Sequence, residues 1–428
     1  MLHHCSMNED YLQYIWRFQH LPAARLHTTS GKEIHVLFQG HWNRNAGPDF
    51  FEAKLRIGRE LWIGSVEVHV KSSEWHKHGH SGDPAYSNVI LHVVLEDDKP
   101  LVNAAGEEVP TLVLKEFLDA SLYERYRRFI GSPEIFPCSG FLPEVSQAAR
   151  AAWLHRMAVE RLENRSKRFA ELLLQYRNDW NALWWQTLCR AFGFGVNQVA
   201  FEILATSLPW QRLARIAHRT ADLEAVLCVH SSWNRLDKRL SEAIELEERY
   251  LHYSRMWEVS PIPRSAWRKG KMKPANHPRV RLGQLAALVA SGAIQWQRIS
   301  SADDLSELRS VFAAQKEVSY LRMKAQCGPT ERIGKQAVDR LLANAVLPLR
   351  FYHSRIRGDQ VGVQQALDWF DVLNPEDHRI ARQWKRSGWG TASMLESQGQ
   401  LHLFREYCSL KKCLSCSIGV QALKQKPP

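Results

Sequence analysis

The hydrophobic period of the chain changes once, and this change constrains the fold more than any other feature. Between residues 33 and 116 the apolar residues form short, β-branched runs separated by Gly, Asn, Asp or Pro, which is typical of a mostly antiparallel sheet. The segment 8–21 precedes these runs with apolar residues at helical spacing. From about residue 145 the period is helical throughout. We therefore predict an α+β core followed by a large all-α domain.

The predicted domains have simple boundaries. Residues 7–125 form the α+β core, 140–400 the helical domain, and 401–422 a cysteine-bearing tail. Trp180, Trp184 and Trp185 fall at helical spacing and are predicted to pack in a core rather than to stack on bases. The chain has no stretch of about 20 apolar residues, and its N-terminus lacks the apolar segment of a signal peptide. We predict a cytoplasmic protein with no membrane partner.

Positive charge is concentrated in the second part of the chain. The net charge is +12, yet residues 1–120 carry 11 Lys and Arg against 16 Asp and Glu. No acidic residue lies between Glu258 and Asp303. Such an excess predicts a polyanionic partner, with nucleic acid as the leading candidate. The candidate phosphate contacts, within a basic loop over 259–302, are Arg264, Arg268, Lys269, Lys271, Lys273, Arg279 and Arg281. The alternative is a basic surface that pairs with the acidic N-terminal domain.

A group of polar residues in the predicted sheet points to catalysis. Glu67, His69 and Lys71 alternate with valines on one strand and therefore share a face. Asp49 precedes them in a Gly-Pro-Asp turn. Two converging carboxylates form a hard-oxygen site suited to Mg²⁺ or Mn²⁺, and a nearby cation can orient a water or stabilise charge on a phosphate. We predict phosphodiester hydrolysis, and the alternative is a sheet with a solvated polar face.

The order of these elements resembles a known superfamily. A helix, a strand, Gly-Pro-Asp, a further strand and Glu-x-x-x-Lys on the next are similar to the PD-(D/E)XK nucleases. The resemblance implies a restriction-endonuclease-like core, with Asp49 and Glu67 as metal ligands and Glu9 as an additional helical carboxylate. The superfamily lysine normally follows the glutamate by two residues, where this chain has His69, so His69 or Lys71 is expected to assist the attacking water. The expected function is a metal-dependent nuclease, and the alternative is a non-catalytic nucleic-acid-binding or scaffold protein.

A second resemblance covers nearly the whole chain. The segments GHWNRNAGPDF, GSVEVHVKSSEWHKHGH, DPAYSNVILHVV, KMKPANHPRVRLGQLA and CLSCSIG together resemble the uncharacterised bacterial domain-of-unknown-function family 2851. This resemblance supplies a family without an activity. The nuclease hypothesis therefore depends on the residues themselves.

Histidines and cysteines suggest further metal sites. His76, His78 and His80 are spaced by two residues, which permits a zinc site if the segment is extended, or else a solvated loop. The tail carries Cys408, Cys413 and Cys416 in a C-x4-C-x2-C arrangement. These thiols predict a structural Zn²⁺ or an iron–sulfur cluster, with free thiols as the alternative. The fourth ligand is expected among His402, Cys138 and Cys327.

Overall fold

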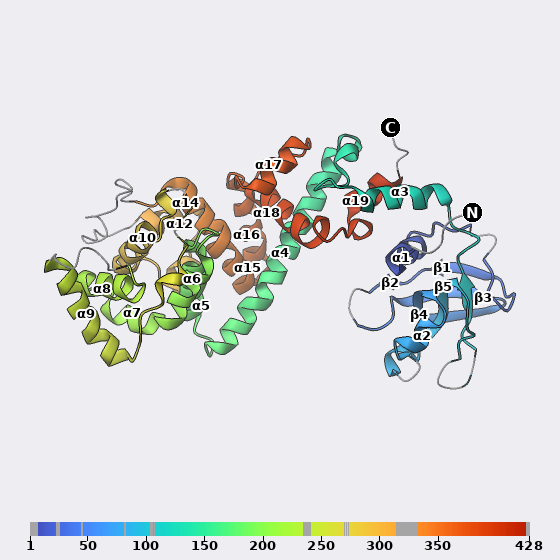
Figure 1. Cartoon of the computed structure of the whole chain (residues 1–428), viewed down its shortest axis with the longest axis horizontal. Helices are drawn as coiled ribbons and strands as arrows, with labels where there is room; N and C mark the ends of the chain where they lie inside the picture. Colours follow the sequence, from blue (N-terminus) through green and yellow to red (C-terminus); the bar gives the residue numbers. More distant parts are fainter. Residues whose placement is uncertain are drawn as a thin grey trace. The chain divides into compact units, whose positions relative to one another are not determined.

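The computed structural model contains two compact units, each described here by itself (Figure 1). The first comprises residues 1–146 and 405–428, and the second residues 147–404. The described residues are 7–22, 26–43, 46–80, 83–102, 106, 108–233, 241–268, 270, 272, 274–313 and 332–424. The predicted α+β class is confirmed. From residue 405 onward the cysteine-bearing tail belongs to the same unit as the sheet.

The first unit is built on a six-stranded sheet with the order β1-β3-β4-β5-β6, and β2 pairs with β3. The strands are β1 (Ile34–Phe38), β2 (His41–Trp42), β3 (Phe50–Ile57), β4 (Glu60–Lys71), β5 (Val89–Glu96) and β6 (Thr111–Val113). The pairs from β1 to β4 are antiparallel, whereas β4–β5 and β5–β6 are parallel, so the sheet is mixed. A parallel pair needs a crossover connection. Helix α2 (Glu74–Lys77) lies in the crossover connection between β4 and β5.

Helix α1 (Glu9–Arg17) begins where the Asn8 side chain accepts a hydrogen bond from the backbone N–H of Tyr11. Its apolar face is buried. Tyr11 stacks on Tyr126 of α3 (Ala120–Gly131), with ring centroids 4.9 Å apart. The opposite side of α1 carries Gln13, which contacts the turn before β3. Packing of the apolar face therefore fixes the position of the polar face over the sheet.

The C-terminal segment returns to the first unit and is held by backbone contacts. Arg125 of α3 donates to the carbonyl of Leu423 in α19 (Ser417–Lys424) at 3.3 Å. The Lys411 ammonium donates to the carbonyls of Ile130 and Ser132. These bonds join residues that are nearly 300 positions apart in the sequence.

The second unit is entirely helical in its described residues. Its helices are α4 (Gln147–Gln175), α5 (Trp180–Phe192), α6 (Gln198–Ser207), α7 (Trp210–Ile216), α8 (Thr220–His230), α9 (Ser241–Trp257), α10 (Pro278–Ser291), α11 (Trp296–Ser300), α12 (Leu305–Ala313), α14 (Lys335–Leu341), α15 (Leu347–Ile356), α16 (Gln360–Val372), α17 (Arg379–Arg386) and α18 (Met394–Leu403). Short 3₁₀ and π segments interrupt them. Within the described part of the chain, no helix combines the length and apolar character that a membrane span requires.

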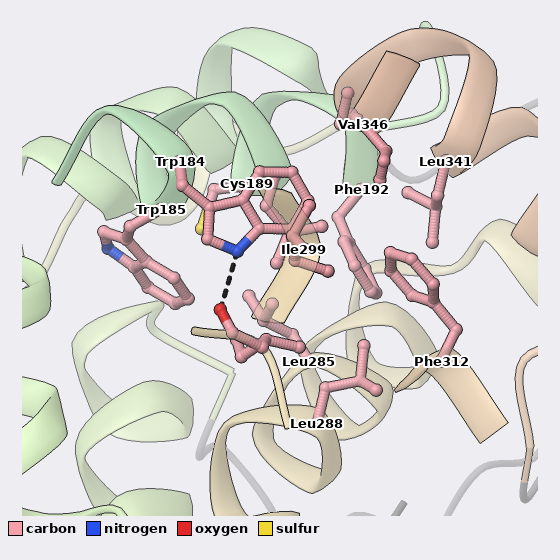
Figure 2. Packing of buried hydrophobic residues seen from close by; sticks show 14 of the residues in the cluster. Trp184, Trp185, Cys189, Phe192, Leu285, Leu288, Ile299, Phe312, Leu341 and Val346 are labelled. Carbon is pink, nitrogen blue, oxygen red and sulfur yellow. Dashed lines mark hydrogen bonds between the residues drawn. The ribbon is translucent and has the colours of Figure 1, made fainter. Parts of the chain in front are cut away.

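The core of the second unit is rich in aromatic residues. Trp184 and Trp185 are buried, as predicted, and belong to the same buried cluster as Phe192 and Phe312 (Figure 2). The Trp184 indole N–H donates to the carbonyl of Ile294 at 2.7 Å. This bond satisfies the polar atom of an otherwise apolar side chain. Trp180 is half-buried and stacks on Trp296, with ring centroids 5.5 Å apart. The tryptophans of α5 therefore pack within the unit, as predicted.

One close helix contact in this unit gives a test of the packing. Gly399 of α18 lies against α4, where an added Cβ would be 2.3 Å from the Leu154 carbonyl oxygen. We expect Gly399→Ala to lower the free energy of unfolding by about 1–3 kcal/mol, because backbone atoms must move apart. Denaturant unfolding measures this change. Gly390→Ala is the matched control, since its Cβ would meet only a side chain at 3.9 Å, and equal stabilities of the two variants would contradict the packing described.

Candidate functional site

The Gly-Pro-Asp turn is held by one asparagine side chain. The Asn43 amide donates to the carbonyls of Ala46, Gly47 and Pro48. Gly47 has a φ of +99°, in the left-handed region that favours glycine. The backbone N–H of Asn43 also donates to the Asp49 carbonyl at 2.7 Å. The turn therefore sets the position of Asp49 at the start of β3.

Asp49 and Glu67 are joined by two reciprocal hydrogen bonds. The backbone N–H of Asp49 donates to Oε2 of Glu67 at 3.0 Å. The backbone N–H of Val68 donates to Oδ2 of Asp49, also at 3.0 Å. Each carboxylate is thus bound by the main chain of the other strand, and the two predicted metal ligands lie together.

Helix α1 brings a third carboxylate to the pair. The Gln13 amide donates to Oδ1 of Asp49 at 2.8 Å and to Oε1 of Glu9 at 3.2 Å. The Trp42 indole N–H in turn approaches the Gln13 side-chain oxygen at 3.4 Å. Gln13 therefore links the predicted residues Glu9 and Asp49. Sequence reasoning missed it because its role depends on how α1 packs on the sheet.

Burial and mutual repulsion make the three carboxyl groups reluctant to ionise. Burial, followed by the charge of Asp49, raises the pKa of Glu67 to about 9. Burial raises the pKa of Asp49 to about 7, against the opposing hydrogen bonds from Val68 and Gln13. The pKa of Glu9 is raised to about 7 by burial and by the charge of Asp49. Groups that repel one another in this way are the groups a cation would stabilise.

Four histidines surround the other side of Glu67. His69 is 1% exposed, and its Nε2 lies 3.6 Å from Oε1 of Glu67. His80 Nε2 lies 3.5 Å from the same oxygen. His69 also contacts His78 through Nε2 at 3.2 Å and His92 through Nδ1 at 2.9 Å. Burial and the neighbouring imidazoles lower the pKa of His69 to about 3, so this ring is neutral at pH 7.

The structure changes the predicted histidine group. The donor atoms of His69, His78 and His80 lie within 4.8 Å of one another, whereas the sequence suggested His76, His78 and His80. His76 lies on the exposed side of α2. His69 takes its place because the crossover folds back over β4, which spacing within the segment 76–80 does not reveal.

Lys71 lies apart from the carboxylates. Its side chain is 49% exposed, and its ammonium lies 3.8 Å from Glu96 on the neighbouring strand β5. The expectation that Lys71 shares a functional face with Glu67 and His69 is not supported by this geometry. The strand leaves the buried part of the sheet at this residue, so alternation no longer places side chains in one environment.

Hydrogen bonds to Asp98 anchor the start of the crossover. The backbone N–H and the hydroxyl of Ser73 both donate to the Asp98 carboxylate at 2.9 Å. The Ser72 hydroxyl donates to the same carboxylate at 3.1 Å. These bonds lower the pKa of Asp98. The loop that carries His78 and His80 therefore leaves β4 in a defined direction.

A cavity of about 370 Å³ opens beside Asp49 in the first unit. Its lining includes Asp49 and Gln13, the aromatic residue Trp42, and the cations Arg17 and Lys412. The Arg17 guanidinium lies over the Trp42 ring, 4.2 Å from its centroid. The cavity thus combines carboxylates, cations and an aromatic surface. The contribution of the tail to this cavity could not be predicted from local sequence patterns.

The cysteines of the tail approach Cys138. Burial raises the pKa of the Cys408 thiol, and the nearby thiols of Cys416, Cys138 and Cys413 raise it further. The Cys138 thiol is affected in the same way by Cys416 and Cys413. Among the described residues, no three of these sulfurs lie within 4.8 Å of one another, whereas the donor atoms of three histidines do. The four thiols are therefore neighbours at a wider spacing.

The other candidate ligands of the tail belong to the second unit or lie outside the described residues. His402 belongs to the second unit, where its Nε2 lies 3.4 Å from Glu160. Cys327 lies outside the described residues. Cys138 is thus the candidate that the first unit itself brings to the tail.

The predicted basic loop lies in the second unit and is partly packed. Arg281 is 5% exposed, its guanidinium lies 3.8 Å from the centre of the Phe194 ring, and it donates to Gln284 and Asn276. Its predicted role as a surface phosphate contact is therefore not supported. Arg264 and Arg279 lie over the Trp233 ring, and Arg268 is exposed. Lys269, Lys271 and Lys273 lie outside the described residues.

Comparison with known proteins yields one family. The family model described as a protein of unknown function (DUF2851) matches residues 9–379. No curated protein matches the chain. No solved structure matches it either.

The raised carboxyl pKa values predict how stability depends on pH. The folded, metal-free protein keeps a proton on Glu67 at pH values where the unfolded chain has lost it, so the contribution of Glu67 to the free energy of unfolding should fall as pH rises from about 5 to about 9. This contribution is on the order of several kcal/mol. Glu67→Gln should flatten the decline. Unfolding measured across this pH range in the presence of a chelator tests the expectation.

The matched control is Glu52→Gln on β3. The Glu52 side chain is 78% exposed, so this variant should keep the wild-type pH dependence. The same slope for wild type and Glu67→Gln would mean that Glu67 is ionised in the folded protein.

Proposed function

We propose that this chain, which belongs to the DUF2851 family of unknown function, is a metal-dependent phosphodiesterase that cleaves nucleic acid. The observation that carries this proposal is the convergence of Asp49, Glu67 and Glu9. They come from a turn, a strand and a helix, and two of them are fixed by backbone hydrogen bonds. A solvated polar sheet face would not bury Glu67 to 4% exposure.

The donor set fits a hard divalent cation such as Mg²⁺ or Mn²⁺. All three side chains offer oxygen, and their raised pKa values reflect a site with too little positive charge. Carboxylate oxygen is the ligand that these ions prefer. When bound, such an ion would polarise a phosphoryl oxygen and lower the pKa of a water.

The chain's own residues have separate tasks in this proposal. Asp49 and Glu67 would hold the ion, and Gln13 positions Asp49 through its 2.8 Å hydrogen bond. Of the two candidates for the residue beside the attacking water, His69 contacts Glu67 whereas Lys71 pairs with Glu96. The His69 imidazole is therefore the better assignment.

The cavity beside Asp49 supports nucleic acid as the substrate class. Arg17 and Lys412 can neutralise phosphates, and the Trp42 ring holds the Arg17 guanidinium in place. Such contacts bind a strand without reading its sequence. This surface lies in the same unit as the carboxylates, so it is a more direct candidate for substrate binding than the loop over 259–302.

A non-catalytic nucleic-acid-binding or scaffold protein remains the second candidate. The positive charge of the helical unit and of the cavity would serve binding without turnover. The two candidates differ in what a carboxylate substitution does. Loss of a carboxylate should abolish cleavage by an enzyme, and it should preserve or strengthen binding by a scaffold because it removes negative charge near phosphates.

We also propose that Cys138, Cys408, Cys413 and Cys416 hold a structural Zn²⁺ or an iron–sulfur cluster. All four thiols belong to the first unit, and those of Cys138, Cys413 and Cys416 are buried. Metal binding would lower the pKa values of these thiols because the thiolate is the ligand. It would also fix the segment that carries Lys411 and Lys412.

Cleavage should depend on the carboxylate pair. Asp49→Asn and Glu67→Gln are each expected to lower the rate by about 100-fold or more, because the ion and the phosphate charge lose their support. Both variants should stay folded, since neither substitution opens an apolar cavity. The assay follows single- and double-stranded DNA and RNA with Mg²⁺ or Mn²⁺.

Lys71→Met and Glu52→Gln serve as matched controls for this assay. Both side chains are exposed or half-exposed on the same sheet, so these variants should retain activity within a few-fold. Cleavage that persists in both carboxylate variants would refute the proposed site.

The cysteine proposal predicts a bound metal in the purified protein. Elemental analysis of protein prepared without a chelator should find roughly one zinc per chain, or iron with acid-labile sulfide. Cys138→Ser and Cys413→Ser should both lose it, and proteolysis should then attack the C-terminal segment. Cys228→Ala is the control, because this buried thiol lies in α8 of the second unit. Protein without stoichiometric zinc or iron would leave the four cysteines as free thiols.

A further inference from the structure

The donor atoms around Oε1 of Glu67 are spaced like the ligands of a metal ion. His69 Nε2 lies 3.2 Å from His78 Nδ1 and 3.6 Å from Oε1 of Glu67. His80 Nε2 lies 3.5 Å from the same oxygen. Ligands about 2.1 Å from a tetrahedral Zn²⁺ lie about 3.4 Å from one another. All three separations are close to this spacing, and the donor atoms of His69, His78 and His80 lie within 4.8 Å of one another.

We propose that His69, His78 and His80 bind a transition-metal ion of the Zn²⁺ class, with Oε1 of Glu67 beside His69 and His80. Three imidazoles favour such an ion over Mg²⁺ or Ca²⁺, which prefer oxygen. Binding at this site does not require the proposed hydrolysis. The histidine site is a second metal-binding site with nitrogen ligands, beside the oxygen-ligand site formed by Asp49 and Glu9.

The tautomer of His69 is set by a partner on the next strand. For Nε2 to bind a metal, the proton of the ring must be on Nδ1. From there it donates to His92 Nε2, which lies 2.9 Å away on β5. Metal-binding histidines normally donate their second N–H to a buried acceptor, and this bond fixes the ring orientation. His92 is fully buried and is therefore a positioning residue for the site.

The crossover loop holds the other two histidines in place. Gly79 has a φ of +75°, which lets the chain reverse between His78 and His80. The His80 ring stacks on Tyr86, with centroids 3.8 Å apart. His78 is exposed, so an ion can enter from solvent. These are features of a site that exists before the ion arrives.

Glu67 would connect the two positions. Its Oε2 faces Asp49, whose backbone N–H it accepts, and its Oε1 faces His69 and His80. A carboxylate that bridges two ions is a common element of binuclear hydrolytic sites, in which the ions lie about 3.5–4 Å apart. If the proposed hydrolysis holds, the histidine site assigns it to a mixed nitrogen–oxygen pair of ions. With that ion bound, His69 is a ligand and no longer acts on the attacking water.

Calorimetric titration of the metal-depleted full chain with Zn²⁺ tests the site, and Co²⁺ absorption reports the ligand environment. The proposed cysteine site would bind these ions as well. The test therefore compares the number of Zn²⁺ ions bound per chain in the wild type with the number bound in each variant. His78→Ala and His80→Ala should each lower the affinity of the histidine site for Zn²⁺ by about 100-fold. Both residues lie on the loop outside the sheet core, so the fold should survive.

Two control variants make the result specific. His76→Ala removes an exposed imidazole from the same loop, and Glu52→Gln removes an exposed carboxylate from the same sheet. Both variants should keep the Zn²⁺ ion that the histidines bind. Identical Zn²⁺ titrations of wild type, His78→Ala and His80→Ala would overturn the histidine site. Zn²⁺ binding without any nuclease activity would instead uphold this site and reject the proposed hydrolysis.

Discussion

The reciprocal hydrogen bonds between the Asp49 turn and the β4 strand are the constraint on which the candidate site depends. Val68 N–H bonds to a side-chain carboxylate, and Asp49 N–H bonds to Glu67. Where the regular pairing of β3 ends, these two backbone N–H groups therefore bond to carboxylate side chains and not to backbone carbonyls. A buried backbone N–H must find an acceptor. The sheet consequently holds two carboxylates together at a cost that an incoming cation can offset.

This arrangement places strong demands on the surrounding structure. Glu67, His69 and His92 are polar side chains inside a small domain, and burial disfavours their charged forms. The fold compensates elsewhere, with the apolar face of α1 packed against α3 and the C-terminal segment bound back to α3. Such a site is stable because the surrounding helices and strands are held in place by apolar packing that takes no direct part in the chemistry.

The sequence predicted which polar residues lie together where neighbours along the chain decide the geometry. Alternation on one strand placed Glu67 and His69 together, and the Gly-Pro-Asp turn indicated Asp49. It failed for Lys71, because alternation says nothing about where a strand leaves the buried part of a sheet. Gln13 and His92 were missed, since a glutamine on a helix and a histidine on a strand gain a role only through the element packed opposite them.

The sequence by itself determined the α+β order of elements, the buried tryptophans of α5 and the acidic pair Asp49 and Glu67, because these follow from local periodicity and turn chemistry. Only the tertiary structure decided that β5 runs parallel to β4, that His69 joins His78 and His80, and that the C-terminal cysteines belong with Cys138. Each of these depends on contacts between residues far apart in the chain. Such contacts are selected by the packing free energy of the whole unit, which no short segment encodes.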